Sequence, residues 1–197
     1  MDYEINLHDL LAGDSNKKKK DTWDNYVPIA SVGNVYNIYL SSDIASPDEY
    51  DEMCFLLDTL DSTQYVQLHI NTPGGSIDSA FKIVDAIKRC PATISARLTG
   101  TVASAGTIIA LSCNEMEVAD HTHFMIHNYS TGAQGKGHEL MEYINFNDRT
   151  LQKTFKGIYK GFLTDEEIES VIRGKDLWLD SDEVKARWNH MKTPKAY

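Results

Sequence analysis

The sequence predicts an α/β fold in which a parallel β-sheet, built from repeated β-α-β units, carries helices on its faces. Short segments rich in β-forming residues alternate with amphipathic segments of helical periodicity, and turn residues separate the two kinds. This alternation is typical of parallel sheets, whose strands need crossover helices. The chain has 197 residues, of which 42% are hydrophobic. It is therefore expected to form one folded domain with a substantial core.

The strands are expected where apolar and polar residues alternate or where β-forming residues gather. They cover residues 35–40, 66–70, 93–98, 116–118 and 124–127. After the first strand, Ser46 and Pro47 form the start signal of a helix. Residues 77–89 predict an amphipathic helix that Pro91 stops. The small apolar residues of segment 102–112 predict a buried helix.

The C-terminal part of the chain is expected to be mainly helical. A long helix is predicted over residues 138–162, because apolar residues recur there at helical spacing. Its apolar stripe has two explanations that periodicity does not separate: packing on the domain's own core, or burial against a second copy of the chain. Thr164 and Glu167 form a capping box for a short helix that ends at Gly174, and Ser181 opens a last helical turn.

Charge and composition disfavour several classes of protein. The chain carries 29 acidic against 19 basic residues, and this net charge of −10 disfavours a general nucleic-acid binder. No segment reaches the roughly 18 apolar residues that a membrane span needs, and the first residues lack the pattern of a secretory signal. The cysteines Cys54, Cys90 and Cys113 are expected to be free thiols in a reducing, cytoplasmic setting.

Residues 1–32 are expected to form an N-terminal arm, and residues 33–197 the folded domain. The arm shows weak periodicity and contains four consecutive lysines, Lys17–Lys20. A solvated, mobile terminal loop is the simpler interpretation, and a docking or localisation signal is the alternative.

Two segments suggest an oxyanion-binding turn beside a nucleophile. Ser104 lies among the small residues 100–106, at a strand-to-helix junction where the backbone N–H of Ala105 is free to donate. Gly74 and Gly75 form a turn after a strand, and their N–H groups suit the same task. This turn matches neither a P-loop nor a dinucleotide-binding fingerprint. Taken alone, Ser104 is also explained as a packing residue and the glycines as a tight turn.

His127 closes an apolar strand at the point where a sheet edge meets a cleft. A serine hydroxyl is a poor nucleophile at neutral pH, and a histidine in this position can take its proton. The alternative is a hydrogen-bonded core histidine. His121 and His123 lie nearby in the sequence, but no cysteine stands at ligand spacing, so neither a metal site nor a cofactor is expected.

Asp176 precedes the apolar segment 177–179, which suggests that its carboxylate is partly buried. A buried carboxylate can orient a histidine and stabilise its charged form. A solvated loop carboxylate is the alternative interpretation. Asp180 and Asp182 compete for the same role, although Asp182 also fits the first turn of a helix.

Together these segments resemble the ClpP family, the proteolytic subunits of Clp proteases, which are serine peptidases with the crotonase-like fold. The resemblance runs from about Ile38 to Trp188. Residues 70–75 are similar to the family's Asn-Ser-Pro-Gly-Gly turn, residues 100–106 to its Gly-x-Ala-Ala-Ser-Met-Gly nucleophile motif, residues 125–127 to its Met-Ile-His, and residues 176–181 to its Asp-x-aromatic-aliphatic segment. The four motifs occur in the family's order and close to its spacing.

The resemblance implies roles for the candidate residues. Ser104 is the implied nucleophile, His127 the general base and Asp176 its orienting acid, while Gly75 and Ala105 donate to the oxyanion and Gly74, Gly132 and Gly135 contact the substrate. A handle at about residues 129–162 would stack two heptameric rings into a chambered tetradecamer that degrades peptides or unfolded proteins. An AAA+ unfoldase of the ClpX or ClpA type is the implied partner, and ATP would be used only by that partner.

Some residues depart from the family pattern. Ala105 replaces the usual methionine, and Asn128-Tyr129 replaces the usual Gln-Pro, as in divergent members that include those found beside phage capsid genes. The N-terminal region does not match the family's Asp-Ile-Tyr-Ser-Arg-Leu-Leu segment, which leaves the unfoldase unidentified. Two alternative functions remain: a catalytically idle scaffold subunit, and a crotonase-type acyl-CoA enzyme, against which the Ser-His-Asp set argues.

Overall fold

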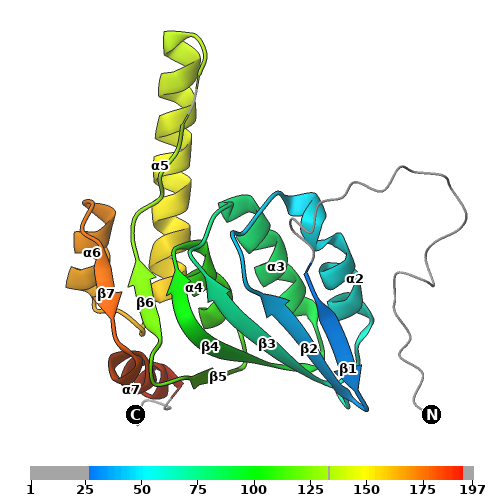
Figure 1. The fold of residues 1–197 in the computed structure, drawn as a ribbon. Coiled ribbons are helices and arrows are strands. Elements are labelled where there is room, and N and C mark those ends of the chain that lie inside the picture. The colour runs from blue at the N-terminus through cyan, green and yellow to red at the C-terminus, as the bar shows by residue number, and fades with distance from the viewer. Residues whose placement is uncertain (1–26, 133, 193–197) are drawn as a thin grey trace, which may run out of the picture.

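The computed structural model describes residues 27–132 and 134–192, which form a seven-stranded sheet with helices packed on it (Figure 1). The strands are β1 (Ile29–Val32), β2 (Val35–Leu40), β3 (Tyr65–Thr72), β4 (Thr93–Ala103), β5 (Glu115–Val118), β6 (His123–Ile126) and β7 (Leu177–Leu179). The helices are η1 (Pro47–Tyr50), α2 (Asp51–Thr59), α3 (Ile77–Arg89), α4 (Ala105–Leu111), α5 (Gly137–Tyr159), α6 (Asp165–Ile172) and α7 (Ser181–Lys192). The sheet order is β1-β2-β3-β4-β6-β7, and β5 pairs with β4 off this path.

The centre of the sheet is parallel, as predicted, but each end of it is antiparallel. Strands β2, β3 and β4 run parallel, and β4 runs parallel to both β5 and β6. The end strands β1 and β7 pair antiparallel with their neighbours. Neither end strand was predicted, because each is only three or four residues long and carries little periodic signal.

The predicted boundary of the N-terminal arm at residue 32 is wrong. Residues 29–32 form β1, and a tight turn at Gly33, whose φ is +59°, leads directly into β2. A two-residue connection of this kind favours hairpin pairing, so the folded domain begins inside the predicted arm. The rest of the arm up to residue 26, including Lys17–Lys20, lies outside the described residues.

The two faces of the sheet differ in character. Ile38, Leu68 and Ala96 are aligned across three strands and are fully buried, and the core that they belong to includes the inner faces of α2, α3 and α4. The opposite face carries polar side chains in the same register, such as His69 and Arg97. This alternation is what a half-buried strand requires.

The predicted helix over residues 102–112 is shorter than expected. Strand β4 continues through Ala103, because Val102 pairs with both β3 and β6, and α4 begins only at Ala105. A short apolar run fits a buried strand as well as a buried helix, and the strand pairing decides between them. A register shift against β3 occurs near Gly100, whose φ is +60°. There Asn71 Oδ1 accepts a hydrogen bond from the N–H of Thr101 at 3.1 Å.

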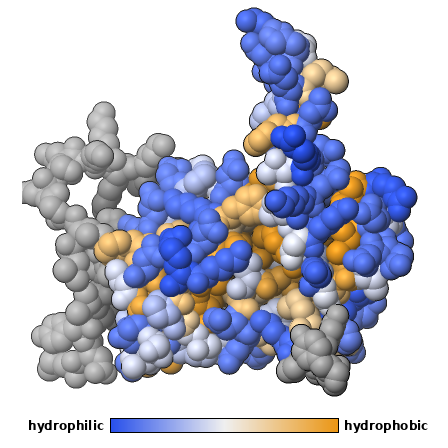
Figure 2. Space-filling model, turned by 180° about the vertical axis from the view of Figure 1, so that it is seen from behind, coloured by the Kyte–Doolittle hydropathy of each residue, from blue (hydrophilic) through white to orange (hydrophobic). Residues whose placement is uncertain are grey.

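Helix α5 projects from the body of the domain, within the handle predicted at about residues 129–162 (Figure 1). Of its residues only Tyr159, at the last position, is buried. Large apolar side chains are exposed along it: Met141, Tyr143, Ile144 and Phe146, with exposed fractions from 43% to 61%. Figure 2 shows the projecting helix from behind, with apolar patches among polar residues. Among the described residues, no helix has the length and apolar character needed to cross a membrane.

Candidate active site

Ser104 occupies a strained turn between β4 and α4. Its backbone angles are φ 52° and ψ −123°, and it is the one non-glycine residue with a positive φ in the described part of the chain. The Ser104 N–H donates to the carbonyl of Met125 at 2.9 Å, which ties the turn to β6. Such conformations cost about 1–3 kcal/mol and persist where the surroundings enforce them. The turn presents the hydroxyl at the end of the sheet, as a strand-to-helix nucleophile elbow does.

Gly74 lies directly against this turn. A Cβ atom at Gly74 would come within 2.6 Å of the Cβ of Ser104 and 2.8 Å of the carbonyl oxygen of Ala103. The φ of Gly74 is also +101°, which side chains rarely adopt. Close packing against Ser104 therefore accounts for glycine at this position, and its contact with substrate stays a prediction.

The backbone N–H groups of Gly75 and Ala105 are both available to a ligand. Ile44 bridges this turn through two hydrogen bonds of 2.7 Å, one to the carbonyl of Gly74 and one from the N–H of Ser76, and both bypass the N–H of Gly75. Ala105 is the first residue of α4, where an N–H has no partner within the helix. Neither group has a hydrogen-bond acceptor in the described part of the chain, and both residues line the same cavity as Ser104.

The structure brings His127 and Ser104 into hydrogen-bond contact. His127 follows β6, and its Nε2 lies 2.7 Å from the Oγ of Ser104. When the proton of the neutral ring is on Nδ1, Nε2 accepts from the serine hydroxyl. The next residue, Asn128, donates through Nδ2 to the carbonyl of Ile172 at 2.9 Å, which fixes the segment after the histidine to the end of α6. The pair is thus arranged for proton transfer from serine to histidine.

Asp176 lies near His127 but does not contact it through its side chain. The antiparallel ladder pairs Ile126 with Leu177, and the next step of that register sets His127 opposite Asp176. Residues opposite each other in such pairs have Cβ atoms about 4.5–5.5 Å apart. However, the Asp176 side chain is exposed, and no hydrogen bond or ion pair joins it to His127 among the described residues. The backbone register therefore sets Asp176 opposite His127, but the described side chains do not complete a Ser-His-Asp triad.

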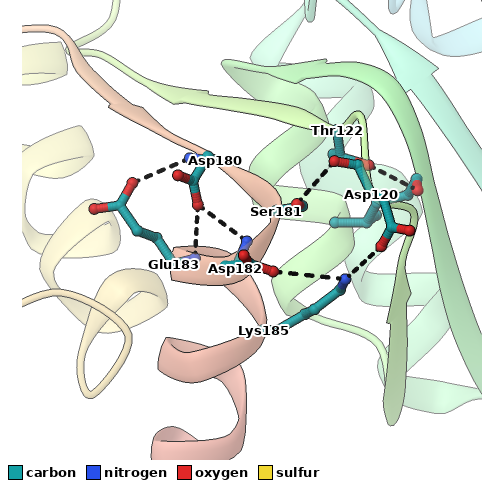
Figure 3. Close-up of polar contacts among 8 residues, drawn as sticks. Asp120, Thr122, Asp180, Ser181, Asp182, Glu183 and Lys185 are labelled. Atoms are coloured by element: carbon teal, nitrogen blue, oxygen red, sulfur yellow. Dashed lines mark hydrogen bonds and ion pairs between the residues drawn. The ribbon is translucent and has the colours of Figure 1, made fainter.

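The competing carboxylates, Asp180 and Asp182, are engaged at the start of α7 (Figure 3). Asp180 Oδ1 accepts from the N–H groups of Asp182 at 3.0 Å and of Glu183 at 2.9 Å, and the Asp180 N–H donates to Glu183 Oε2 at 3.1 Å. This reciprocal arrangement is a capping box. Asp182 lies 3.9 Å from Lys185, which also pairs with Asp120 at 2.9 Å. Both aspartates therefore anchor α7, and neither is a candidate to orient His127.

A cavity of about 320 Å³ opens beside Ser104 and His127. Its lining is largely apolar on the side formed by α3, α4 and α5, where Phe81, Ile108, Leu151, Phe155 and Ile158 contribute. Residues 128–131 form another part of the wall. A cavity of this size and lining fits an apolar side chain of a peptide.

Gly132 and Gly135 lie outside this cavity. Both are exposed, and the described residues between β6 and α5 form no strand. A strand needs a partner for its backbone groups, and none of the described strands pairs with this segment. Their contact with substrate stays a prediction.

The three histidines of the sequence segment 121–127 do not gather into a metal site. His121 and His123 are exposed. In the described ranges, no group of three or more His, Cys, Asp or Glu side chains is arranged to hold a metal ion.

Two buried polar residues next to Ser104 were not predicted from the sequence. Thr107 lies in α4 and is fully buried, and Tyr159 at the end of α5 is 1% exposed. Their hydroxyl oxygens are 2.5 Å apart. A threonine three residues after Ser104, within an otherwise apolar segment, was the available signal, but nothing in the sequence paired it with Tyr159.

Comparison with known proteins places the chain in a family. The family model described as Clp protease matches residues 25–186. The chain is 26% identical over 173 residues to the ATP-dependent Clp protease proteolytic subunit 2 of Treponema denticola, covering 86% of each chain. It is 32% identical over 123 residues to the ATP-dependent Clp protease proteolytic subunit 1 of Chlamydia caviae, covering 59% of this chain and 63% of that protein.

A solved structure, a variant of ClpP1 from Listeria monocytogenes, shares the fold. The TM-score is 0.61 at 23% sequence identity, and the match covers 79% of this chain and 87% of that one. The crotonase-like architecture expected from the sequence is thereby confirmed.

Proposed function

The chain belongs to the Clp protease family, and we propose that it is a serine endopeptidase that hydrolyses peptides or unfolded proteins. The observation that carries the proposal is the 2.7 Å contact between Ser104 Oγ and His127 Nε2. Beside this contact lie two free backbone N–H groups and an apolar cavity. A nucleophile, a base, oxyanion donors and a side-chain pocket are the parts that acyl transfer from a peptide requires.

The proposed reaction proceeds through a covalent acyl-enzyme. Ser104 Oγ attacks the scissile carbonyl carbon while its proton passes to His127 Nε2, and the N–H groups of Gly75 and Ala105 stabilise the oxyanion. The imidazolium then gives its proton to the leaving amine, and the C–N bond breaks. Water, deprotonated by His127, attacks the ester, and Ser104 recovers its proton as the carboxylic acid product leaves.

Assembly with further copies of the chain is part of the proposal. The exposed apolar residues of α5 offer a surface that a second copy can bury. Membership of the family supports stacked heptameric rings, and the names of the relatives, ATP-dependent Clp proteases, support an AAA+ unfoldase as partner. In such an assembly, the segment after β6 would gain a pairing partner, and Asp176 would turn toward His127 to orient its ring.

A second candidate function is a catalytically idle scaffold subunit. The specific observation in its favour is the exposed Asp176, which leaves His127 without its orienting acid in the single chain. A correctly placed serine and histidine retain only part of the activity of a closed triad.

Labelling with a fluorophosphonate probe, read by intact-protein and peptide mass spectrometry, tests the proposal. We expect one adduct, on Ser104, and a loss of at least about a hundredfold in labelling rate for His127→Ala, because the hydroxyl then lacks its base. His123→Ala is the matched control, since it removes an exposed histidine of the neighbouring strand. An assembled wild-type protein that forms no adduct would contradict the peptidase function and favour the idle subunit.

A further inference from the structure

A continuous set of buried hydrogen bonds runs from the end of α5 to the carbonyl group of the candidate nucleophile. The Oη of Tyr159 lies 2.5 Å from Thr107 Oγ1. Thr107 Oγ1 in turn donates to the carbonyl oxygen of Ser104 at 2.7 Å, and the backbone N–H of Thr107 donates to the same oxygen at 2.9 Å. Both side chains are almost completely removed from solvent, so these bonds are not shared with bulk water.

The direction of the donors in this set follows from counting protons. The hydroxyl of Thr107 has one proton, which it donates to the Ser104 carbonyl. Its oxygen is then left to accept, and the phenol of Tyr159 must be the donor between the two hydroxyls. Burial raises the pKa of Tyr159, so the phenol keeps its proton throughout the working pH range. Phe155 packs against the Tyr159 ring at a centroid distance of 4.3 Å and holds it in place.

The carbonyl that receives these bonds belongs to the same peptide group as the N–H of Ala105. The described residues contain no cis peptide bond, so the N–H of Ala105 points away from the Ser104 carbonyl oxygen. That N–H is one of the two free donors at the cavity. A hydrogen bond accepted at one end of a peptide group polarises it and strengthens the donor at the other end.

We propose that Tyr159 and Thr107 are positioning residues that hold and polarise the Ser104–Ala105 peptide group, so that its N–H stabilises the oxyanion. We call the hydrogen bonds from Tyr159 through Thr107 to the Ser104 carbonyl the relay. This inference rests on the proposed peptidase function and adds two residues whose hydroxyl groups touch none of the reacting atoms, although Tyr159 also lines the cavity. The relay acts on charge that develops only in the transition state, so it contributes to kcat and not to the binding of the substrate.

Removing the hydroxyl groups one at a time tests the relay in the assembled enzyme. Tyr159→Phe and Thr107→Val each remove one buried hydroxyl, whereas Thr107→Ser keeps it. We expect the first two to lower kcat roughly tenfold with KM nearly unchanged, the size of effect that one buried hydrogen bond can supply. Thr107→Ser should retain most of the activity. The double variant should be no slower than Thr107→Val, because Tyr159 acts only through Thr107.

One control variant and one binding measurement distinguish the proposed role from a merely structural one. Tyr50→Phe removes another buried tyrosyl hydroxyl, which accepts from the N–H of Ala45 at 3.0 Å. This variant should leave kcat unchanged. A peptide boronate, which forms a tetrahedral adduct on serine, should bind Tyr159→Phe more weakly by the same factor as the loss in kcat, while the product peptide binds equally.

Three results would overturn the inference. Unchanged kcat in a folded Tyr159→Phe variant excludes the relay even if Thr107→Val fails to fold. A rise in KM with constant kcat would limit Tyr159 to its place in the cavity wall. A wild-type protein that forms no boronate adduct contradicts the peptidase function itself, and an active wild type with an equally active Tyr159→Phe variant contradicts the relay alone.

Discussion

The two halves of the candidate active site differ in how firmly the rest of the chain holds them. The nucleophile half, made of Gly74, Gly75, Ser104 and Ala105, is fixed by backbone bonds and by contacts with no room for an added carbon atom. The acid half consists of Asp176 and the projecting helix α5. There the carboxylate is exposed, and the helix, which projects from the body of the domain, buries only its last residue, Tyr159 (Figure 1).

This difference indicates which part of the candidate site a single chain can form and which part it cannot. The nucleophile half is determined by the packing of β3, β4 and α4, which are part of the core. The acid half depends on segments with little buried surface, and such segments are the least stable parts of a fold. A proteolytic site completed only by assembly would keep the free subunit from cutting other proteins.

Substitution of Gly74 tests the rigidity of the nucleophile half and has the largest expected effect. Gly74→Ala would place a methyl group against Ser104 and Ala103 at a φ that alanine avoids, so we expect Ser104 labelling to slow by on the order of a thousandfold, comparable to the loss of oxyanion stabilisation. Gly132→Ala is the matched control, because a Cβ there meets nothing within 4 Å. Equal labelling of the two folded variants, measured by mass spectrometry, would show that the turn is not rigid.

Substitution of Asp176 tests whether assembly completes the acid half of the site. Asp176→Asn should slow peptide hydrolysis by on the order of a hundredfold in the assembled protein, where the carboxylate would orient His127. In a dissociated form, made with Ile144→Lys and Phe146→Lys on α5, the same change should have little further effect.

The matched control for this prediction is Asp182→Asn, which changes an exposed carboxylate in the first turn of α7. Size-exclusion fractions assayed with a fluorogenic peptide provide the measurement. An assembled Asp176→Asn protein as active as the wild type would show that Asp176 is only a surface carboxylate.

The same contrast explains what the sequence predicted well. Helix α3 was predicted with both of its ends, because its apolar face and the stop at Pro91 are local signals, and the structure adds an N-cap at Ser76. Ser104 and His127 were identified from motifs, and the structure brings them together. Glycines 74 and 75 were identified as a turn, but the need for close approach to Ser104 and Ile44 was visible only in three dimensions.

What the sequence did not predict depends on contacts between distant segments. The end of β4 was taken for helix, because a run of small apolar residues has no period that separates the two. Ser46 was expected to cap a helix through its side chain, but η1 begins there without such a bond. The pairing of Thr107 with Tyr159 joins residues 52 positions apart. No local pattern encodes a contact of this kind.

An ion pair between α6 and α7, the helices that precede and follow Asp176 in the chain, provides the smallest expected effect and concerns stability. Arg187 on α7 holds Glu167 on α6 by two hydrogen bonds of 2.8 Å, and Glu167 also accepts from the N–H of Thr164. The hydrogen bonds from Arg187 lower the pKa of Glu167 below its ordinary value of 4.5, against the opposing effect of burial. Because the unfolded chain binds this proton more readily, the pair's contribution to stability is complete above about pH 5 and declines as the pH falls through the lowered pKa.

Glu167→Gln keeps the shape of the side chain and removes this charge. We expect the free energy of unfolding to fall by about 1 kcal/mol at pH 7, the size typical of a partly exposed, two-bond ion pair. The difference from the wild type should shrink when urea unfolding is repeated at acid pH, below the ordinary carboxyl pKa of 4.5. Glu166→Gln, at the neighbouring exposed position in the first turn of α6, should show neither effect. A constant difference at all pH values would mean that Glu167 stabilises α6 through its capping box and not through Arg187.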